Sequence, residues 1–212
     1  MFDKSTTVEA FLDAAAARKP TPGGGSVTAL VGALAASMGE MALNYSIGKK
    51  GFEAFEPELK PALAELTRAR LMLLVLMVED QAAFEAMSAT RKLAPTDPEK
   101  IGRFNAALLA CVRIPEAIAA SSVAVLELVD RILGFVNPFL LSDLAVCADL
   151  AMASTRCAIY NVRANLPDVV DPTDRTAIEG TIRSVLSRAA TLIQQISPRI
   201  WERHALEIGT GL

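Results

Sequence analysis

One passage of the sequence predicts most of the architecture: Thr21-Pro22-Gly23-Gly24-Gly25-Ser26, followed by a run of small residues that closes with Gly48-Lys49-Lys50. Three consecutive glycines lose more backbone entropy on folding than any other triplet, so the fold should need the backbone itself at this turn. Directly before a helix, the turn leaves amide N–H groups bare, and these favour an anion or a carbonyl oxygen. As a phosphate-binding signal the turn is weak, because no Gly-Lys-Ser/Thr follows it as in a Walker motif.

The run after the turn, residues 24–47, predicts a helix with one stripe of small residues. The members of the stripe recur at spacings of four and three residues and are Gly25, Ala29, Gly32, Ala36 and Gly39. This spacing places them on one side of an α-helix. Each internal glycine costs roughly 1 kcal/mol relative to alanine, and close approach of a second helix must offset that cost. We therefore predict tight helix packing along this stripe.

The rest of the chain predicts further long helices separated by proline-containing breaks. The expected helices cover about residues 6–17, 24–47, 61–90, 97–133, 137–166 and 171–204, with a linker over 52–61. Thr6 with Glu9 resembles a capping box, and Asp97-Pro98 and Asn137-Pro138 are start signals. The core is built mainly from Ala, Leu, Val and Ile, since 52% of residues are hydrophobic but only 5% aromatic. No segment alternates as a strand does, so we predict an all-α fold, a single domain (1–212) of long antiparallel helices.

Composition and charge narrow the class of protein. A net charge of −3 leaves no basic face large enough for nucleic acid. The mean hydropathy of +0.35 is high for a monomer and favours an oligomer. No signal peptide opens the chain, and the uncharged run 26–39 ends at Glu40, short of the roughly 17 residues that a bilayer span needs. We expect a soluble cytoplasmic protein that binds neither nucleic acid nor a membrane.

Cysteine and histidine are scarce. Cys111, Cys147 and Cys157 lie in apolar sequence without a C-x-x-C pair, which predicts buried thiols in a reducing compartment. The one histidine, His204, makes a histidine-ligated metal site or a Ser-His-Asp triad very improbable. We therefore predict no metal site, and proton transfer must use carboxylates, lysines, tyrosines or bound water.

The helix expected after Asn137 carries a polar stripe. It consists of Asp143, Ser154, Asn161 and Asn165, with Cys147 and Cys157 alongside. An unpaired polar group in such apolar surroundings costs about 1–3 kcal/mol, so these side chains need partners. Two interpretations stay open: satisfied hydrogen bonds between helices, or a wet groove that binds a flat polar ligand. The first suits any single residue, Asp143 as a first-turn acid included, and the second suits the whole stripe.

Other ionisable residues also allow two interpretations. Asp80 ends the apolar run 71–78, so it is either a general base whose pKa is raised by apolar surroundings or an ordinary solvent-facing acid. Glu40 lies between small and apolar residues, where a partly buried carboxylate fits. Lys49 and Lys50 are either a solvated pair after a helix C-terminus or a holder for a carboxylate-bearing substrate.

An ordered set of these residues resembles a known family. In chain order the set is Thr21 to Ser26, Asn44 with Ile47-Gly48-Lys49-Lys50, Asp80 with Phe84, Pro115, Asn137 with Ser142-Asp143, and Asn161-Val162 with Asn165-Leu166. It resembles the cyclodeaminase domain of formiminotransferase-cyclodeaminase and its small bacterial relatives, the methenyltetrahydrofolate cyclohydrolases of one-carbon metabolism. The resemblance covers about Val8 to Trp201. Gly51, Phe52 and Val136 stand where that family usually has a lysine, a tyrosine and a glycine.

The resemblance implies an all-α homodimer that acts on a tetrahydrofolate, with no metal and no further cofactor. Formimino-tetrahydrofolate cyclodeaminase is the first function it implies, and methenyl-tetrahydrofolate cyclohydrolase the second. A non-catalytic helical bundle that binds a folate or a partner protein is the alternative from another class.

The resemblance also implies roles for individual residues. Asp143 or Asp80 is the acid–base group, with Asp143 preferred because it lies on the polar stripe. The expected substrate-binding residues are Thr21, Pro22, Gly23, Gly24, Gly25, Ser26, Asn44, Lys49, Lys50, Asn137, Ser142, Asn161 and Asn165. The glycine turn and the two asparagines near 161–165 would position the pterin or the one-carbon unit, and the two lysines would meet the glutamate tail.

Overall fold

The structure, a computed structural model, describes residues 1–94 and 96–209 and consists of helices. They are α1 (Val8–Ala16), α2 (Gly24–Asn44), α3 (Glu56–Arg91), α4 (Lys100–Ile132), α5 (Leu141–Asn165) and α6 (Pro172–Gly209). Three short 3-10 turns, Glu53–Phe55, Pro138–Leu140 and Leu166–Asp168, join some of them. The described residues contain no strand, which confirms the predicted all-α class.

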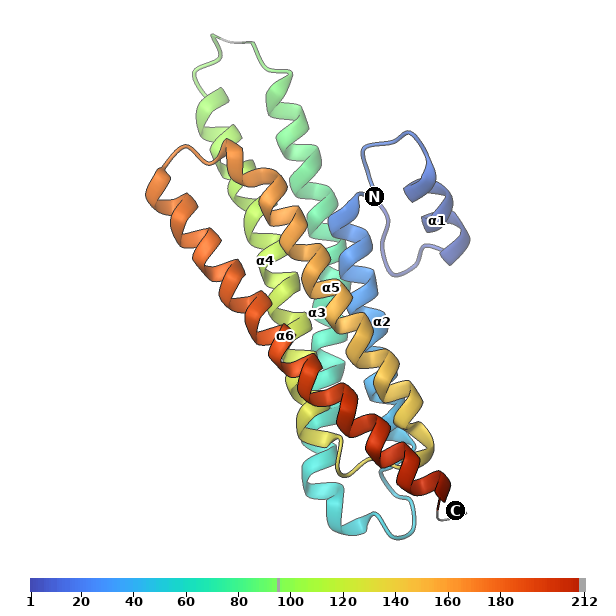
Figure 1. The fold of residues 1–212 in the computed structure, drawn as a ribbon. Coiled ribbons are helices and arrows are strands. Elements are labelled where there is room, and N and C mark those ends of the chain that lie inside the picture. The colour runs from blue at the N-terminus through green and yellow to red at the C-terminus, as the bar shows by residue number, and fades with distance from the viewer. Residues whose placement is uncertain (95, 210–212) are drawn as a thin grey trace.

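The helices from α2 to α6 run side by side in an elongated bundle, and successive helices reverse direction (Figure 1). α2 packs against α3 and α5, α4 packs against the same two helices, and α6 lies along α4 and α5. The main core is aliphatic, with Leu43, Leu66, Leu126 and Ile132 fully buried. α1 stands to one side of the bundle near the start of α2 (Figure 1).

The small-residue stripe of α2 lies where three helices meet. A Cβ atom on Gly32 would lie 2.9 Å from the Ser154 Oγ atom of α5 and 3.1 Å from a methyl group of Leu73 in α3. A Cβ atom on Gly39 would lie 2.9 Å from a methyl group of Leu66 and 3.2 Å from the Cys147 sulfur. These distances are shorter than van der Waals contact, so the prediction of tight packing is confirmed.

Several helix boundaries differ from the sequence-based expectation. The N-cap of α1 is Thr7, whose hydroxyl accepts from the Ala10 N–H, because either of two adjacent threonines can serve as a cap. The capping box expected from Thr6 and Glu9 is therefore wrong, because a cap at Thr7 places Ala10 at the third helical position. α3 begins at Glu56, inside the expected linker, and Pro61 lies within the helix. An early proline removes only one helical hydrogen bond, so it does not stop α3.

Two other expectations need correction. Cys111 and Cys147 are buried as predicted, but Cys157 is exposed because its position on α5 faces away from the bundle. By length and composition alone, Gly24–Asn44, Lys100–Ile132 and Pro138–Asp168 are each apolar enough to cross a membrane. The argument that Glu40 leaves too short an apolar run is therefore wrong, although about half of each window is buried inside the bundle.

Candidate active site

A cavity of about 180 Å³ lies at the N-terminal end of α2, where α3, α4 and α5 all continue past that helix (Figure 1). We call this cavity the Asp80 pocket. Its walls are Pro20, Thr21 and Gly23 to Gly25 of the turn, Asp80 and Phe84 of α3, Cys111 and Pro115 of α4, and Asn161, Ala164 and Asn165 of α5. The pocket thus unites the glycine turn with one carboxylate and two amides from distant parts of the chain.

The glycine turn lets the backbone approach the polar side chains of the pocket. A Cβ atom on Gly25 would lie 2.0 Å from the Asp80 Oδ1 atom, so no larger residue fits there without displacing the carboxylate. A Cβ atom on Gly24 would lie 3.0 Å from the Asn161 Oδ1 atom. Gly23 is the N-cap of α2 and has no side chain to bond the first N–H groups of the helix. These groups and the positive end of the helix dipole therefore face the pocket.

Asp80 is the acidic group of the pocket. The Ser26 hydroxyl donates a hydrogen bond of 2.8 Å to its Oδ2 atom. Burial raises the pKa of Asp80 above its ordinary value, and hydrogen bonds from Ser26 offset only part of that effect. The residues lining the pocket include no lysine, arginine or histidine, so no cation in the wall neutralises the carboxylate. Of the two interpretations of Asp80, the structure supports the partly buried acid.

The two asparagines of α5 are held by the backbone around them. The Asn161 Nδ2 atom donates to the Cys157 carbonyl at 2.9 Å, which directs its Oδ1 atom toward the glycine turn. The Asn165 Nδ2 atom donates to the carbonyls of Cys111 and Asn161, both at 3.0 Å. Both side chains therefore have fixed positions, as residues that orient a ligand require.

A second polar cluster, the Lys49 end, lies at the opposite end of the bundle. The Lys49 Nζ atom donates to the Asn137 Oδ1 atom at 2.8 Å and sits 5.4 Å and 5.1 Å from the ring centres of Phe52 and Phe139. The Asn137 N–H donates to the buried Ser46 hydroxyl at 2.8 Å. Lys49 is thus engaged in packing the loop after α2 onto the start of α5. The other expected site residues at this end are Asn44, Lys50 and Ser142, which are exposed, and the partly exposed Asp143.

The polar stripe of α5 does not form one groove. Asp143 and Asn161 are eighteen residues apart on this helix, or about 27 Å at 1.5 Å per residue. Between them Ser154 is fully buried, accepts from the Ser122 hydroxyl and donates to the Thr28 carbonyl. The groove interpretation therefore holds only for the Asn161 end, and hydrogen bonding between helices explains Ser154. Asp143 therefore lies far from the Asp80 pocket of the same chain, and of the two acids only Asp80 lines that pocket.

Cys111, Pro20 and Ala164 line the pocket but were not among the sequence-based site residues. Only Cys111 had a usable signal, because it precedes Pro115 by four residues and so shares its side of α4. Burial raises the pKa of the Cys111 thiol, and the Asp80 charge adds to this effect. A raised pKa keeps the thiol in its neutral form, so Cys111 lines the pocket as an uncharged side chain.

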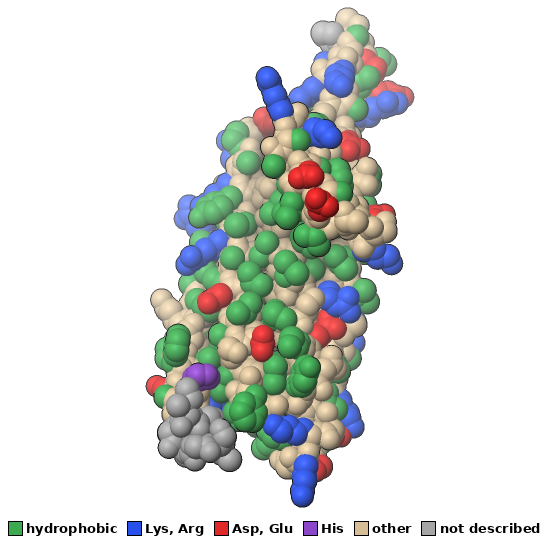
Figure 2. Space-filling model, turned by 90° about the vertical axis from the view of Figure 1, so that its right-hand side faces the viewer, with side chains coloured by type: hydrophobic (Ala, Val, Ile, Leu, Met, Phe, Trp, Pro, Cys, Tyr) green, Lys and Arg blue, Asp and Glu red, His purple; other side chains and the backbone are tan. Residues whose placement is uncertain are grey.

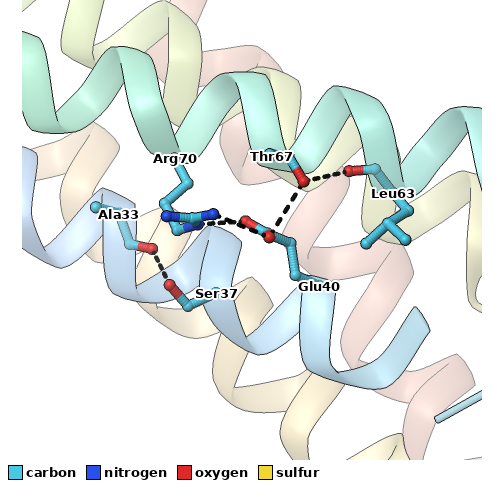
Figure 3. A network of polar contacts seen from close by, with 6 residues as sticks. All are labelled: Ala33, Ser37, Glu40, Leu63, Thr67 and Arg70. Atoms are coloured by element: carbon cyan, nitrogen blue, oxygen red, sulfur yellow. Dashed lines mark hydrogen bonds and ion pairs between the residues drawn. The ribbon is translucent and has the colours of Figure 1, made fainter. Parts of the chain in front are cut away.

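Glu40 is partly buried, as the sequence predicted, but it is paired. The Arg70 side chain donates to its two carboxylate oxygens at 2.6 Å and 3.3 Å, and the Thr67 hydroxyl donates at 3.1 Å (Figure 3). This network joins α2 to α3 halfway along the bundle, and it pairs both carboxylate oxygens of Glu40 within the chain. Among residues 1–94 and 96–209, no three His, Cys, Asp or Glu side chains gather where they could hold a metal ion.

A helical bundle with a polar, glycine-walled pocket at one end belongs to the class of all-α proteins that bind a small molecule between their helices. The sequence matches the formiminotransferase-cyclodeaminase family over residues 7–184. The chain therefore belongs to this family.

Individual relatives agree with this assignment. The chain is 31% identical over 194 residues to the methenyltetrahydrofolate cyclohydrolase of Methylorubrum extorquens, a match that covers 90% of this chain and 93% of that protein. It is 29% identical to the formimidoyltransferase-cyclodeaminase of Rattus norvegicus over 87% of this chain, which spans only 35% of that longer protein. The crystal structure of formiminotetrahydrofolate cyclodeaminase from Thermotoga maritima superposes with a TM-score of 0.86 at 29% identity, covering 93% of this chain and 97% of that one.

Proposed function

We propose that the chain is a folate-dependent one-carbon enzyme, a formimino-tetrahydrofolate cyclodeaminase that forms 5,10-methenyl-tetrahydrofolate and ammonia. The second candidate is methenyl-tetrahydrofolate cyclohydrolase, which the near full-length match to the Methylorubrum protein favours. The observation that carries the proposal is Asp80, a partly buried carboxylate in a pocket whose lining residues include no basic side chain. A non-catalytic folate-binding bundle would have no use for an acid held at this energetic cost.

The charge of the pocket suits both one-carbon units. A protonated formimino group is an amidinium, and the methenyl bridge shares one positive charge over two folate nitrogens. A partly buried carboxylate is stabilised by such a cation, because no cationic side chain among the lining residues already neutralises it. The Asn161 amide oxygen, directed at the glycine turn, adds a second partial negative charge. Folates with a neutral formyl group gain none of this stabilisation.

Asp80 can perform the proton transfers of the deaminase reaction. The folate N10 attacks the formimino carbon and a carbon–nitrogen bond forms. Asp80 takes the proton from N10 and returns it to the departing nitrogen, so that ammonia leaves and the amidinium bridge remains. A carboxyl group with a raised pKa can act as base in the first step and as acid in the second. Ser26 fixes one oxygen, which orients the other toward the substrate.

The hydrolase reaction uses the same group in a shorter sequence. Water attacks the methenyl carbon and Asp80 accepts a proton from that water. Asp80 then returns the proton to the departing folate nitrogen as its carbon–nitrogen bond breaks, and the remaining hydroxyl proton passes to solvent to leave a formyl-folate. These transfers occur at nitrogen and water, so the proposal includes no metal and no cofactor beyond the tetrahydrofolate substrate.

We further propose a cytoplasmic homodimer that contacts neither membrane nor nucleic acid. Figure 2 shows hydrophobic side chains gathered over the middle of one long face, with few charges among them. From α2, Val27, Leu34 and Met41 are exposed at seven-residue intervals, which is the spacing of a helix seam. A two-fold axis perpendicular to the helices would bring the Lys49 end of one copy beside the Asp80 pocket of the other. In one chain alone, Lys49 and Lys50 are too far from that pocket to meet the glutamate tail.

One spectrophotometric experiment tests the function. Methenyl-tetrahydrofolate absorbs in the near ultraviolet, so its formation from formimino-tetrahydrofolate and its hydrolysis can each be followed, with ammonia measured in parallel. We expect absorbance to rise with ammonia release in the first assay. Loss of absorbance in the second assay alone would assign the cyclohydrolase reaction, and no change in either would contradict both. Light scattering at micromolar protein concentration should give the mass of a dimer.

A further inference from the structure

The N-terminal arm, residues 1–23, is a separate feature of the molecule. Figure 1 shows α1 standing beside the bundle, joined to the start of α2 by a curved loop. Of the α1 residues only Phe11 and Ala14 are buried, whereas Val8 is 76% and Leu12 59% exposed. The arm therefore depends on a few attachments for its position.

The strongest attachment is made by Gln81, a fully buried side chain. Its Oε1 atom accepts from the Phe2 N–H at 2.7 Å, and its Nε2 atom donates to the Phe2 carbonyl at 2.7 Å. The Nε2 atom also donates to the Met77 carbonyl of its own helix at 3.0 Å. The Phe2 ring packs edge-on against Phe11, which is buried against α2 and α3. Residue 2 is thus held by two backbone bonds and one ring contact.

The same arm supplies a wall of the Asp80 pocket. Its last residues, Pro20, Thr21 and Gly23, line that pocket, and the Thr21 hydroxyl donates to the Glu85 carboxylate at 3.2 Å. Both ends of the arm are therefore fixed to α3 within five residues of the acid. Gln81 follows Asp80 directly in the sequence but faces the arm.

Because Gln81 is buried, its two hydrogen bonds to Phe2 form or break together when the arm moves. If the arm moved away, the Gln81 amide would lose both bonds to Phe2 at a site that is otherwise apolar. Losing buried hydrogen bonds is unfavourable, so the closed position of the arm is favoured by the two bonds to Phe2 that the Gln81 amide would lose, while its bond to the Met77 carbonyl would remain.

We propose that Gln81 is a positioning residue: by holding Phe2 it seats the arm, and the seated arm completes the substrate pocket. This inference rests on the proposed function for its choice of substrate. The family match begins at residue 7, so the contact with Phe2 lies outside the matched range.

The test uses Gln81→Leu, which keeps a similar volume but removes the amide. We expect faster hydrogen exchange over residues 3–19 and a KM for the folate substrate raised about ten- to a hundredfold, since a displaced wall spoils substrate alignment. kcat should change little, and the acidic limb of the pH profile should stay in place because Asp80 is untouched. Gln194→Leu, on an exposed position of α6, is the matched control and should resemble the wild type.

A second pair of variants keeps the test valid if Gln81→Leu does not fold. Phe2→Ala and Phe2→Pro both remove the ring, but only the proline removes the N–H that Gln81 accepts. The proline variant should show the larger KM and the faster exchange. Wild-type turnover, measured first, tests the proposed function by itself. Unchanged exchange in the arm, or faster exchange with an unchanged KM, would overturn the positioning role.

Discussion

The two ends of the bundle differ in whether a charged side chain finds its partners within the chain. At the Lys49 end the ammonium group has an amide oxygen and two aromatic rings around it, all from the same chain. In the Asp80 pocket the carboxylate has the Ser26 hydroxyl but no cation among the lining residues. Groups whose partners lie within the chain stabilise the fold, whereas a group left without its counter-charge is available to a ligand.

The carboxyl groups at the two ends differ in the direction in which their pKa values are shifted. Burial raises the pKa of Asp80. Near Lys49, hydrogen bonds from Lys60 and from the Gly48 N–H lower the pKa of Glu56, which is partly exposed. A raised pKa makes a carboxyl group better able to take up and return a proton, whereas a lowered pKa keeps it a fixed charge.

The largest expected effect comes from removing the acid of the pocket. Asp80→Asn keeps the shape of the side chain but removes its titratable proton, so turnover should fall by about 10²–10⁴-fold. Binding of the folate should fall less, because much of the loss occurs in the transition state. Asp143→Asn is the matched change at the other end and should retain nearly normal turnover. The reverse result in steady-state kinetics would move the acid–base role to Asp143.

Glycine substitutions should separate the two ends almost as clearly. Gly25→Ala places a Cβ atom 2.0 Å from the Asp80 Oδ1 atom, so the carboxylate must move and turnover should fall by about a hundredfold. Gly48→Ala has open space around it but a φ of +76°, which costs an alanine about 1–2 kcal/mol. It should lower the melting temperature and leave kcat unchanged. Normal activity in a folded Gly25→Ala variant would contradict the close approach of the turn to Asp80.

The pH dependence of stability should show the energetic cost of the pocket acid. Asp80 binds its proton more tightly in the folded protein than in the unfolded chain, where its pKa is near 3.8. The folded state therefore holds more protons above pH 3.8, and its stability falls as pH rises through the raised pKa. Asp80→Asn has no carboxyl group at this position, so its stability does not fall with rising pH in this way. The variant should therefore be more stable than the wild type at pH 7. The difference should shrink toward pH 4 in urea titrations, and a difference that does not change between pH 4 and pH 7 would refute the raised pKa.

Most of the fold could be predicted from the sequence because its signals are local. Proline and asparagine mark helix starts, and the spacing from Gly25 to Gly39 shows which side of α2 packs. The start of α3 was missed because a proline near a helix N-terminus resembles a linker. The sequence alone does not distinguish Thr6 from Thr7 as the cap of α1, because either threonine side chain can accept the capping hydrogen bond.

The site could be predicted only in part. Helical periodicity gives the side of a helix on which a residue lies, but not what surrounds that residue at its position along the helix axis. Asp143 and Asn161 therefore shared one predicted groove, although about 27 Å of α5 separates them. The contacts of Asp80 with the glycine turn and of Gln81 with Phe2 join segments more than fifty residues apart. No local pattern encodes such pairs.

The smallest expected effect tests whether the two ends meet in a dimer. Lys49→Met keeps the apolar stem and removes the ammonium, so it should cost about 1 kcal/mol of stability through the lost hydrogen bond and ring contacts. Turnover of a monoglutamyl folate should stay within about twofold of the wild type, because the pocket of the same chain is too distant to be disturbed. If a second copy brings its Lys49 end to the pocket, the KM for a polyglutamyl folate should rise up to about fivefold, since one exposed ion pair contributes about 0.2–1 kcal/mol.

Lys60→Met removes the same charge from the same end, where that lysine pairs with Glu56, and should leave both KM values unchanged. A KM for the polyglutamyl folate that stays at its wild-type value in Lys49→Met would confine this end to a structural role, and a large loss of kcat would show that the ends cooperate in the chemistry itself.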